Sequence, residues 1–190
     1  MKQYNGYKAE MMSSFDELPT GGYICKIMNA EEKETRNGGS RLEVSIDIAE
    51  GEHKGYYANL YKSDTREDKK WRGVFNIFLP RDDGSEKDGW AKNKFNNFIG
   101  CVEDANGGYR FDWDEKKLKG KLVALVFRRE EYKKQNGSTG WTVKPFKCIP
   151  IGDCRDGKWG KYEDKPLANS SGASVPAYAH AEDEGGDLPF

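Results

Sequence analysis

The sequence predicts a mainly β protein with a helical segment in its middle, and three observations support this fold class. Apolar and polar residues alternate without a break along residues 41–48, as in a half-buried strand. Between residues 71 and 102 the apolar spacing changes to that of amphipathic helices. Apolar runs then return at residues 122–127 and 141–151, on either side of an Asn-Gly turn signal.

Three strands are expected before the helical segment. Pro and Gly precede an alternating run from Tyr23 to about Lys33, which predicts the first strand, and the segment Asn37-Gly38-Gly39 predicts a turn into the second strand at 41–48. The run YYANLYKS at 56–63 predicts a third strand, in which alternation points Tyr57 and Tyr61 outward. These strands would form a meander.

Two helices and two further strands are expected in the second half of the chain. The helices are predicted by i, i+3, i+4, i+7 spacing in two sets, which are Trp71, Val74, Phe75 and Phe78, then Phe95, Phe98, Ile99 and Val102. The strands at 122–127 and 141–151 flank a charged hairpin with Asn136-Gly137 at its turn. Pro145 indicates that the last strand lies at an edge or contains a bulge.

This order of elements is that of the OB-fold, a five-stranded Greek-key barrel, with the helices inserted between strands three and four. Oligonucleotides and oligosaccharides bind such barrels across strands two and three and at the loops 1-2 and 4-5. We therefore expect an OB-fold-like domain over residues 1–165 and a separate linker and tail over 166–190.

Composition limits the compartment and the chemistry. No stretch approaches the roughly 20 apolar residues of a membrane helix, and the first 15 residues lack the apolar run of a signal peptide, so a cytoplasmic protein is expected. The four cysteines occur singly, without a C-x-x-C pair, and the chain has only two histidines. We expect reduced structural thiols, no bound metal and no cofactor.

Basic and aromatic residues gather where an OB-fold binds its ligand. Cations neutralise phosphates and flat side chains stack on bases without reading their identity, so this combination predicts a single-stranded nucleic-acid site. The alternative is a purely structural role, in which Tyr57 and Tyr61 only cover the sheet and the Lys and Arg residues only keep the hairpin solvated. The candidates are Lys33, Arg36, Tyr57, Tyr61, Arg128, Arg129, Tyr132, Lys133, Lys134, Trp141 and Lys144.

The C-terminal segment differs from the rest in composition and in charge. Residues 167–181 are rich in Ser, Gly and Ala, which is typical of a flexible linker. From Pro166 onward there is no Lys or Arg, while the preceding body holds 31 bases and the other 28 of the 32 acids. The end of the tail combines four acids with an apolar tip, in the order Glu182, Asp183, Glu184, Asp187, Leu188, Pro189 and Phe190.

The closing residues EDEGGDLPF resemble the C-terminal tip of bacterial single-stranded DNA-binding proteins, in which a disordered linker ends in several Asp residues followed by Ile-Pro-Phe. Leu188 stands where that isoleucine would be, and Gly185 and Gly186 interrupt the acids. The segments LPTGGYICKI, GYYANLY and LKGKLVALVFRREEY are similar in layout to phage-encoded proteins of this class. The resemblance implies that the barrel coats single-stranded DNA during phage replication or recombination. It also implies that the tip recruits replication, recombination or repair enzymes.

Other classes of function remain open at this point. Asp112, Asp114 and Glu115 could hold magnesium in a nuclease, although no other catalytic constellation accompanies them and an enzyme is not expected. The barrel could also be a protein-interaction adaptor that binds no nucleic acid, with the tail as a solubilising extension. A preference for DNA over RNA rests on the resemblance alone, and the sequence leaves open whether the chain forms a homo-oligomer.

Overall fold

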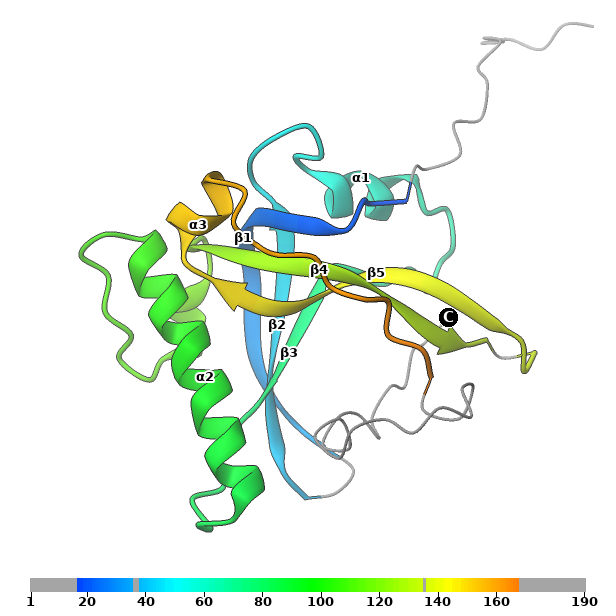
Figure 1. Ribbon diagram of the computed structural model, residues 1–190. Helices are drawn as coiled ribbons and strands as arrows, with labels where there is room; N and C mark the ends of the chain where they lie inside the picture. The colour runs from blue at the N-terminus through cyan, green and yellow to red at the C-terminus, as the bar shows by residue number, and fades with distance from the viewer. Residues whose placement is uncertain (1–16, 36–37, 135, 168–190) are drawn as a thin grey trace, which may run out of the picture.

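The computed structural model describes residues 17–35, 38–134 and 136–167, which form one sheet with helices packed around it (Figure 1). The elements in chain order are β1 (Gly21–Glu34), β2 (Ser40–Ile48), α1 (Tyr56–Ser63), β3 (Val74–Phe78), α2 (Glu86–Ala105), the 3-10 helix η1 (Glu115–Leu118), β4 (Leu122–Lys133), β5 (Thr139–Ile149) and α3 (Ile151–Arg155).

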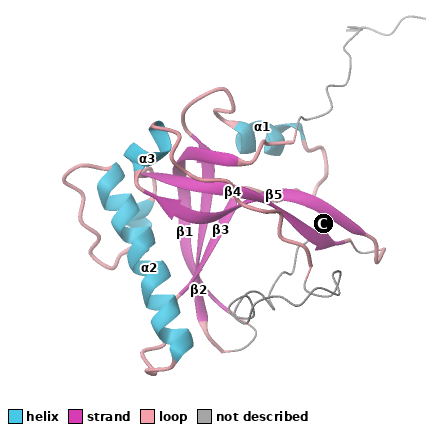
Figure 2. Cartoon of the chain, viewed as in Figure 1, coloured by secondary structure: helices cyan, strands magenta, loops and turns pink. Residues whose placement is uncertain are grey.

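The five strands form an antiparallel sheet in the order β3-β2-β1-β4-β5. The central strand β1 is shared, because Gly21–Lys26 pairs with β4 and Cys25–Glu34 pairs with β2. A bulge between Ile27 and Asn29 interrupts the second of these registers, and bulges bend strands. In Figure 2, β4 and β5 accordingly run along the first half of β1 and cross the direction of β2, β3 and the second half of β1.

The sheet is open. The edge strands β3 and β5 approach each other to within 8 Å between Cα atoms, but no hydrogen-bonded ladder joins them in the described part of the chain. The structure therefore shows a mainly antiparallel β protein with helices, whereas the expected closed barrel is not formed by backbone pairing.

The core has two parts because β4 is buried on both faces. Val123, Leu125 and Phe127 face the main core, which also contains residues of α1, α2 and η1. Ala124 and Val126 face a smaller cluster beneath α3. The nearly continuous apolar run at 122–127 is the sequence signature of a strand covered on both sides.

The strand expected at 56–63 is wrong, since this segment is the helix α1. Tyr56, Tyr57 and Leu60 pack against the core at helical spacing. The buried carboxylate of Asp47 accepts a hydrogen bond from the backbone N–H of Tyr57 (3.0 Å), in the first turn of the helix. A negative group in this position stabilises a helix N-terminus, and local alternation in the sequence does not show that contact.

The helix expected from Trp71 to Phe78 is also wrong, since Val74–Phe78 forms β3. Phe75 and Ile77 are buried and Phe78 is exposed, which is period-two alternation over a stretch too short to distinguish from a helical pattern. Gly73 precedes the strand, and a Cβ there would lie 2.4 Å from the carbonyl oxygen of Ile46. Only glycine lets the chain approach β2 this closely.

The remaining expected elements are confirmed. β1, β2, α2, β4 and β5 lie where the patterns placed them, and α2 and η1 are the insertion between the third and fourth strands. The last strand is an edge strand, and the β4–β5 register shifts next to Pro145, leaving Phe146 as the extra residue. Both turn signals are used, with Gly38 and Gly137 at φ 71° and 82°.

The four cysteines are buried and unpaired. Burial raises the pKa of the Cys25 and Cys148 thiols well above their ordinary value. None of the helices in the described ranges has the length and apolarity needed to cross a membrane.

Candidate nucleic-acid interface

The β4–β5 hairpin carries most of the predicted site residues and projects from the body on the side opposite α2 (Figure 1). In an antiparallel pair, directly opposed residues share a face of the sheet. Arg129 lies opposite Val143, and Glu131 lies opposite Trp141, whereas Arg128 lies opposite Lys144. The hairpin therefore divides the predicted set between two surfaces. We call them the Trp141 face (Arg129, Glu131, Lys133, Trp141, Val143) and the Lys144 face (Arg128, Glu130, Tyr132, Thr142, Lys144).

The Trp141 face combines an exposed indole with a guanidinium that lies against it. The guanidinium carbon of Arg129 lies 5.2 Å from the centroid of the Trp141 ring, within the range of a cation–π contact. Nη1 of Arg129 is 3.6 Å from a carboxylate oxygen of Asp164, and its buried Nε has no hydrogen-bond partner among the described residues. Trp141 is 38% exposed, and Lys133 extends the same face toward the turn.

On the Lys144 face, the cation Arg128 is already bound by side chains of the protein. Nε of Arg128 donates a hydrogen bond to Glu130 (3.0 Å), and the guanidinium lies 4.4 Å from the centroid of the Phe146 ring. Phe146 in turn meets Tyr162 edge to face, at 4.8 Å between centroids. Arg128 is thus held by internal partners, which leaves Tyr132 and Lys144 as the more available members of this face.

A second basic and aromatic surface lies on the outer face of β1, β2 and β3. Lys33 and Arg41 are cross-strand partners, and Arg41 lies opposite Phe78 on its other side. Both cations contact Glu43, at 2.6 Å from Lys33 and 3.2 Å from Arg41, so this surface is largely neutralised. Phe78 is 42% exposed and gives it an open ring.

The two tyrosines of α1 differ in exposure, and one of them corrects the prediction. Tyr57 is only 5% exposed, and burial raises the pKa of its phenol, so it belongs to the core and its ring cannot stack on a base. Tyr61 is 37% exposed, with the Nζ of Lys69 lying 4.7 Å from its ring centroid. Tyr61 therefore remains a candidate, although it lies on a helix and not on the predicted third strand.

Three predicted features lie at or beyond the limits of the description. Lys134 is exposed at the turn, where its backbone N–H donates to the carbonyl oxygen of Ser138 (2.7 Å). Arg36 and the whole tip, from Glu182 to Phe190, lie outside the described residues.

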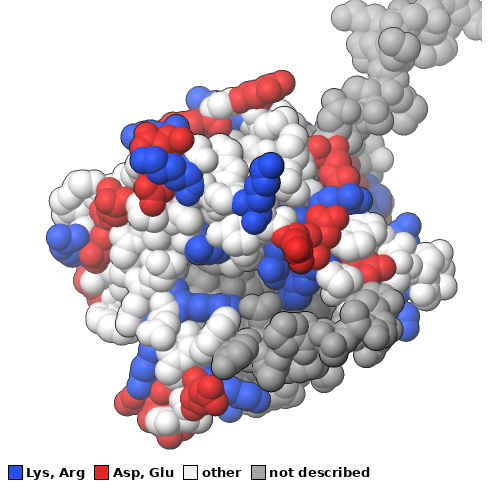
Figure 3. All heavy atoms as spheres, in the orientation of Figure 1, with Lys and Arg blue, Asp and Glu red and all other residues white. Residues whose placement is uncertain are grey.

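Charges of both signs are interspersed on the face shown in Figure 3, and they do not form one continuous basic field. Several candidate cations have an acid within ion-pair distance, as with Lys33 and Glu43, or Arg128 and Glu130. An anionic ligand would have to displace these internal acids or use the cations that lack them.

The acids considered for a nuclease hold local structure. Asp112 pairs with Lys117, and this interaction holds the pKa of the Asp112 carboxyl below its ordinary value. A side-chain oxygen of Asp114 accepts from the backbone N–H of Lys116 (3.1 Å) and begins η1. Within the described ranges, no group of three or more His, Cys, Asp or Glu side chains is arranged to hold a metal ion.

Sequence reading missed several exposed aromatic and basic residues. Phe78 was assigned to a buried helical stripe, although its position one residue after Ile77 is also compatible with an outward strand position. For Phe146, the only indication in the sequence was the bulge expected next to Pro145. Trp113 is 79% exposed, and nothing in the pattern FDWDE indicated an open ring.

A family model matches part of the chain. Residues 5–78 match a family model described as "Protein of unknown function (DUF669)". This range spans β1, β2, α1 and β3, and it ends before α2 and the β4–β5 hairpin. No curated protein matches the chain.

Proposed function

We propose that this protein binds single-stranded DNA without sequence preference and that the Trp141 face of the β4–β5 hairpin is its primary contact. The protein acts as a binding protein and not as an enzyme, in the cytoplasm of a bacterial host. The observation that carries the proposal is the Arg129–Trp141 pair, in which an exposed indole lies beside a guanidinium on a projecting hairpin.

The chemistry of the pair suits a single strand better than a duplex. An indole can stack on an unpaired base, and this contact contributes about 1 to 3 kcal/mol per base in known single-strand sites. The neighbouring Arg129 and Lys133 would contact the phosphates on either side. In a duplex the bases are already stacked on one another, so the stacking contribution is lost and only the charge contacts remain.

The strand arrangement agrees with an OB-fold role. The order β3-β2-β1-β4-β5, with a bent and shared β1, is the order that an OB barrel has when opened between its third and fifth strands. The hairpin between β4 and β5 then corresponds to the 4-5 loop of such barrels, and Phe78, Lys33 and Arg41 lie on the strand face that such barrels also use.

The tip completes the proposed function through its resemblance to the tips of bacterial single-stranded DNA-binding proteins. A terminal carboxylate beside Phe190 and Pro189 suits an apolar pocket rimmed by basic residues, and the acids would steer the encounter. The partners would be replication, recombination or repair enzymes.

Fluorescence anisotropy with a labelled oligo(dT), the matched duplex and a matched RNA strand, each at several salt concentrations, tests the DNA part. We expect tight single-strand binding that weakens steeply with salt, and at least about tenfold weaker duplex binding. Equal affinity for duplex and single strand, or binding insensitive to salt, would contradict the proposal. Shortening of the labelled strand in the presence of magnesium would instead support the nuclease.

A further inference from the structure

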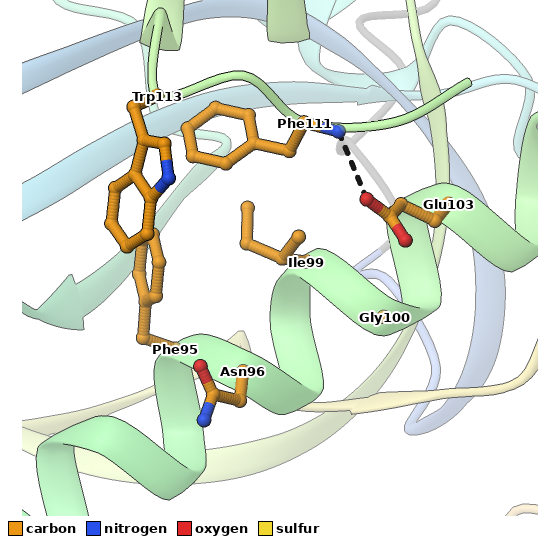
Figure 4. Close-up of a pocket in the computed structure, with 7 residues that line it drawn as sticks. All are labelled: Phe95, Asn96, Ile99, Gly100, Glu103, Phe111 and Trp113. Atoms are coloured by element: carbon orange, nitrogen blue, oxygen red, sulfur yellow. Dashed lines mark hydrogen bonds between the residues drawn. The ribbon is translucent and has the colours of Figure 1, made fainter.

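An aromatic groove lies between the tip of the β1–β2 hairpin and the loop that follows α2. It has a volume of about 580 Å³ and is lined, among others, by Glu32, Leu42, Arg81, Phe95, Phe111 and Trp113. A smaller cavity of about 250 Å³ continues along α2 and shares its three rings (Figure 4). We call the two together the Trp113 groove. This size is within the range of ordinary ligand pockets.

Trp113 presents an open ring at the edge of this groove. Its indole stacks on Phe95 at 5.8 Å between centroids and 20° between planes, and Phe111 lies 5.9 Å away. The Ile99 side chain lies beside the three rings (Figure 4). Trp113 also has φ 69°, a conformation that is an outlier for a bulky residue. A large apolar side chain is thus held outward, where it contributes little to the core.

The loop that carries Trp113 is fixed to its surroundings. One carboxylate oxygen of Glu103 on α2 accepts from the backbone N–H of Phe111 (2.9 Å), and the other lies 3.0 Å from Nη1 of Arg110. Asp112 pairs with Lys117 on η1. A rigid apolar platform loses less conformational entropy when a ligand binds to it.

The charge of the Trp113 groove selects the kind of ligand. Glu32 and Glu115 line it, and neither forms an ion pair with another described residue. Among the described residues that line it, Arg81 is the one cation, so acids are in excess there. Asp112 and Asp114 lie in the same loop as Trp113, but both are within ion-pair distance of Lys117 and add little to this excess. Phosphates would be repelled here, whereas a cation would be attracted both by the acids and by the indole face.

We propose that the Trp113 groove docks a short segment of a partner protein that carries an Arg or Lys beside an apolar side chain. The apolar side chain lies against Trp113, Phe95 and Phe111. The cation reaches Glu32 or Glu115 at the rim. This interaction is separate from DNA binding and does not require the C-terminal tip.

Selection of random heptapeptides displayed on phage, with the full chain as the target, tests the proposal. The enriched peptides should combine a basic residue with an adjacent apolar one. Anisotropy titration of the most enriched peptide, made synthetically, should show at least about tenfold weaker binding to Trp113→Ala and about threefold weaker binding to Glu115→Gln, with less salt dependence in the latter. Trp90→Ala is the matched control, because Trp90 is an exposed tryptophan of α2 outside the groove, and it should bind as the wild type does.

Three outcomes would overturn the proposal. The first is that no basic and apolar motif is enriched. The second is that the enriched peptide binds Trp113→Ala as tightly as wild type. The third is that Trp113→Ala lowers oligo(dT) affinity several-fold while peptides are not retained, which would make the groove part of the DNA path. Thermal melting of each variant verifies that it is folded. If Trp113→Ala melts early, Glu115→Gln still tests the proposal, because it removes one charge and keeps all three rings.

Discussion

The Trp141 face and the Trp113 groove both present an exposed indole, and they differ in the charges that surround it. Trp141 lies beside Arg129, with Lys133 on the same face and Glu131 directly opposite in the register. Trp113 lies in a groove lined by Glu32 and Glu115, with Arg81 as the one cation among the lining residues that the structure describes. An exposed aromatic ring by itself can contact many kinds of ligand. We therefore expect the neighbouring charges to select between a nucleic acid and a basic peptide.

The two regions also differ in how the ring is supported. Trp141 is placed by the β4–β5 register, which the alternation of the strand fixes. Trp113 is placed by a loop held through Glu103 and Asp112, with a backbone conformation unusual for its residue type. Strand residues follow a period that can be read in the sequence, whereas such loop residues do not.

Charge reversal at the tip of the hairpin should have the largest effect. Lys133→Glu combined with Lys134→Glu is expected to weaken oligo(dT) binding by about 100-fold at low salt, because two phosphate contacts are replaced by repulsion. Lys116→Glu combined with Lys119→Glu changes the net charge equally but lies at η1, next to the Trp113 groove. Anisotropy titrations should show a much smaller loss for this pair. Equal losses would mean that net charge, and not the hairpin, controls binding.

Removal of one indole at a time should have the next largest effect and separates the two regions directly. Trp141→Ala should weaken oligo(dT) binding by about 1 to 3 kcal/mol if its ring stacks on a base. Trp113→Ala should leave this affinity unchanged, since its groove repels phosphates. Thermal melting belongs with the titrations, because an early-melting Trp141→Ala would indicate a structural role. If Trp113→Ala weakened DNA binding as much, the distinction by charge would be wrong.

Exchange of the charges in the Trp113 groove should have the smallest effect and tests the same distinction in reverse. Glu32→Lys combined with Glu115→Lys keeps all three rings and replaces the acids with bases. If charge selects the ligand, oligo(dT) affinity should rise by roughly threefold at low salt, and the rise should disappear as salt increases. Binding of the selected basic peptide should fall in the same variant. If neither affinity changed, the charges of the groove would not determine which ligand it binds.

Long elements with a single clear period were predictable, and short aromatic ones were not. The alternation in β2 and the buried run in β4 identified both strands, and the spacing of Phe95, Phe98 and Val102 identified α2. The segments 56–63 and 74–78 were assigned to each other's structure type. Both have apolar residues at positions that satisfy either period, so their long-range contacts decide between helix and strand.

The candidate site was predicted as a set of residue types and not as an arrangement. Sequence reading placed Arg129, Lys133 and Trp141 on one hairpin, and the structure puts them on the same face of it. It also included Tyr57, which is buried, and Arg128, which is held by Glu130 and Phe146. Whether a side chain is free or already engaged depends on neighbours distant in sequence, which a local pattern does not contain.

By itself, the sequence determined the composition of this protein's surfaces and the elements that have one dominant period. The basic and aromatic hairpin, the bulge next to Pro145 and the charge contrast between the body and the tail all follow from residue types and their order. The tertiary structure alone decided that α1 is a helix, through the buried Asp47 carboxylate at its first turn, and that β3 is a strand, through its ladder with β2. It also decided that Trp113 opens onto an acidic groove. Each of these outcomes depends on contacts between residues far apart in the chain. The free energy of such contacts exceeds the intrinsic preference of a segment for helix or strand, which is small for segments of five to eight residues.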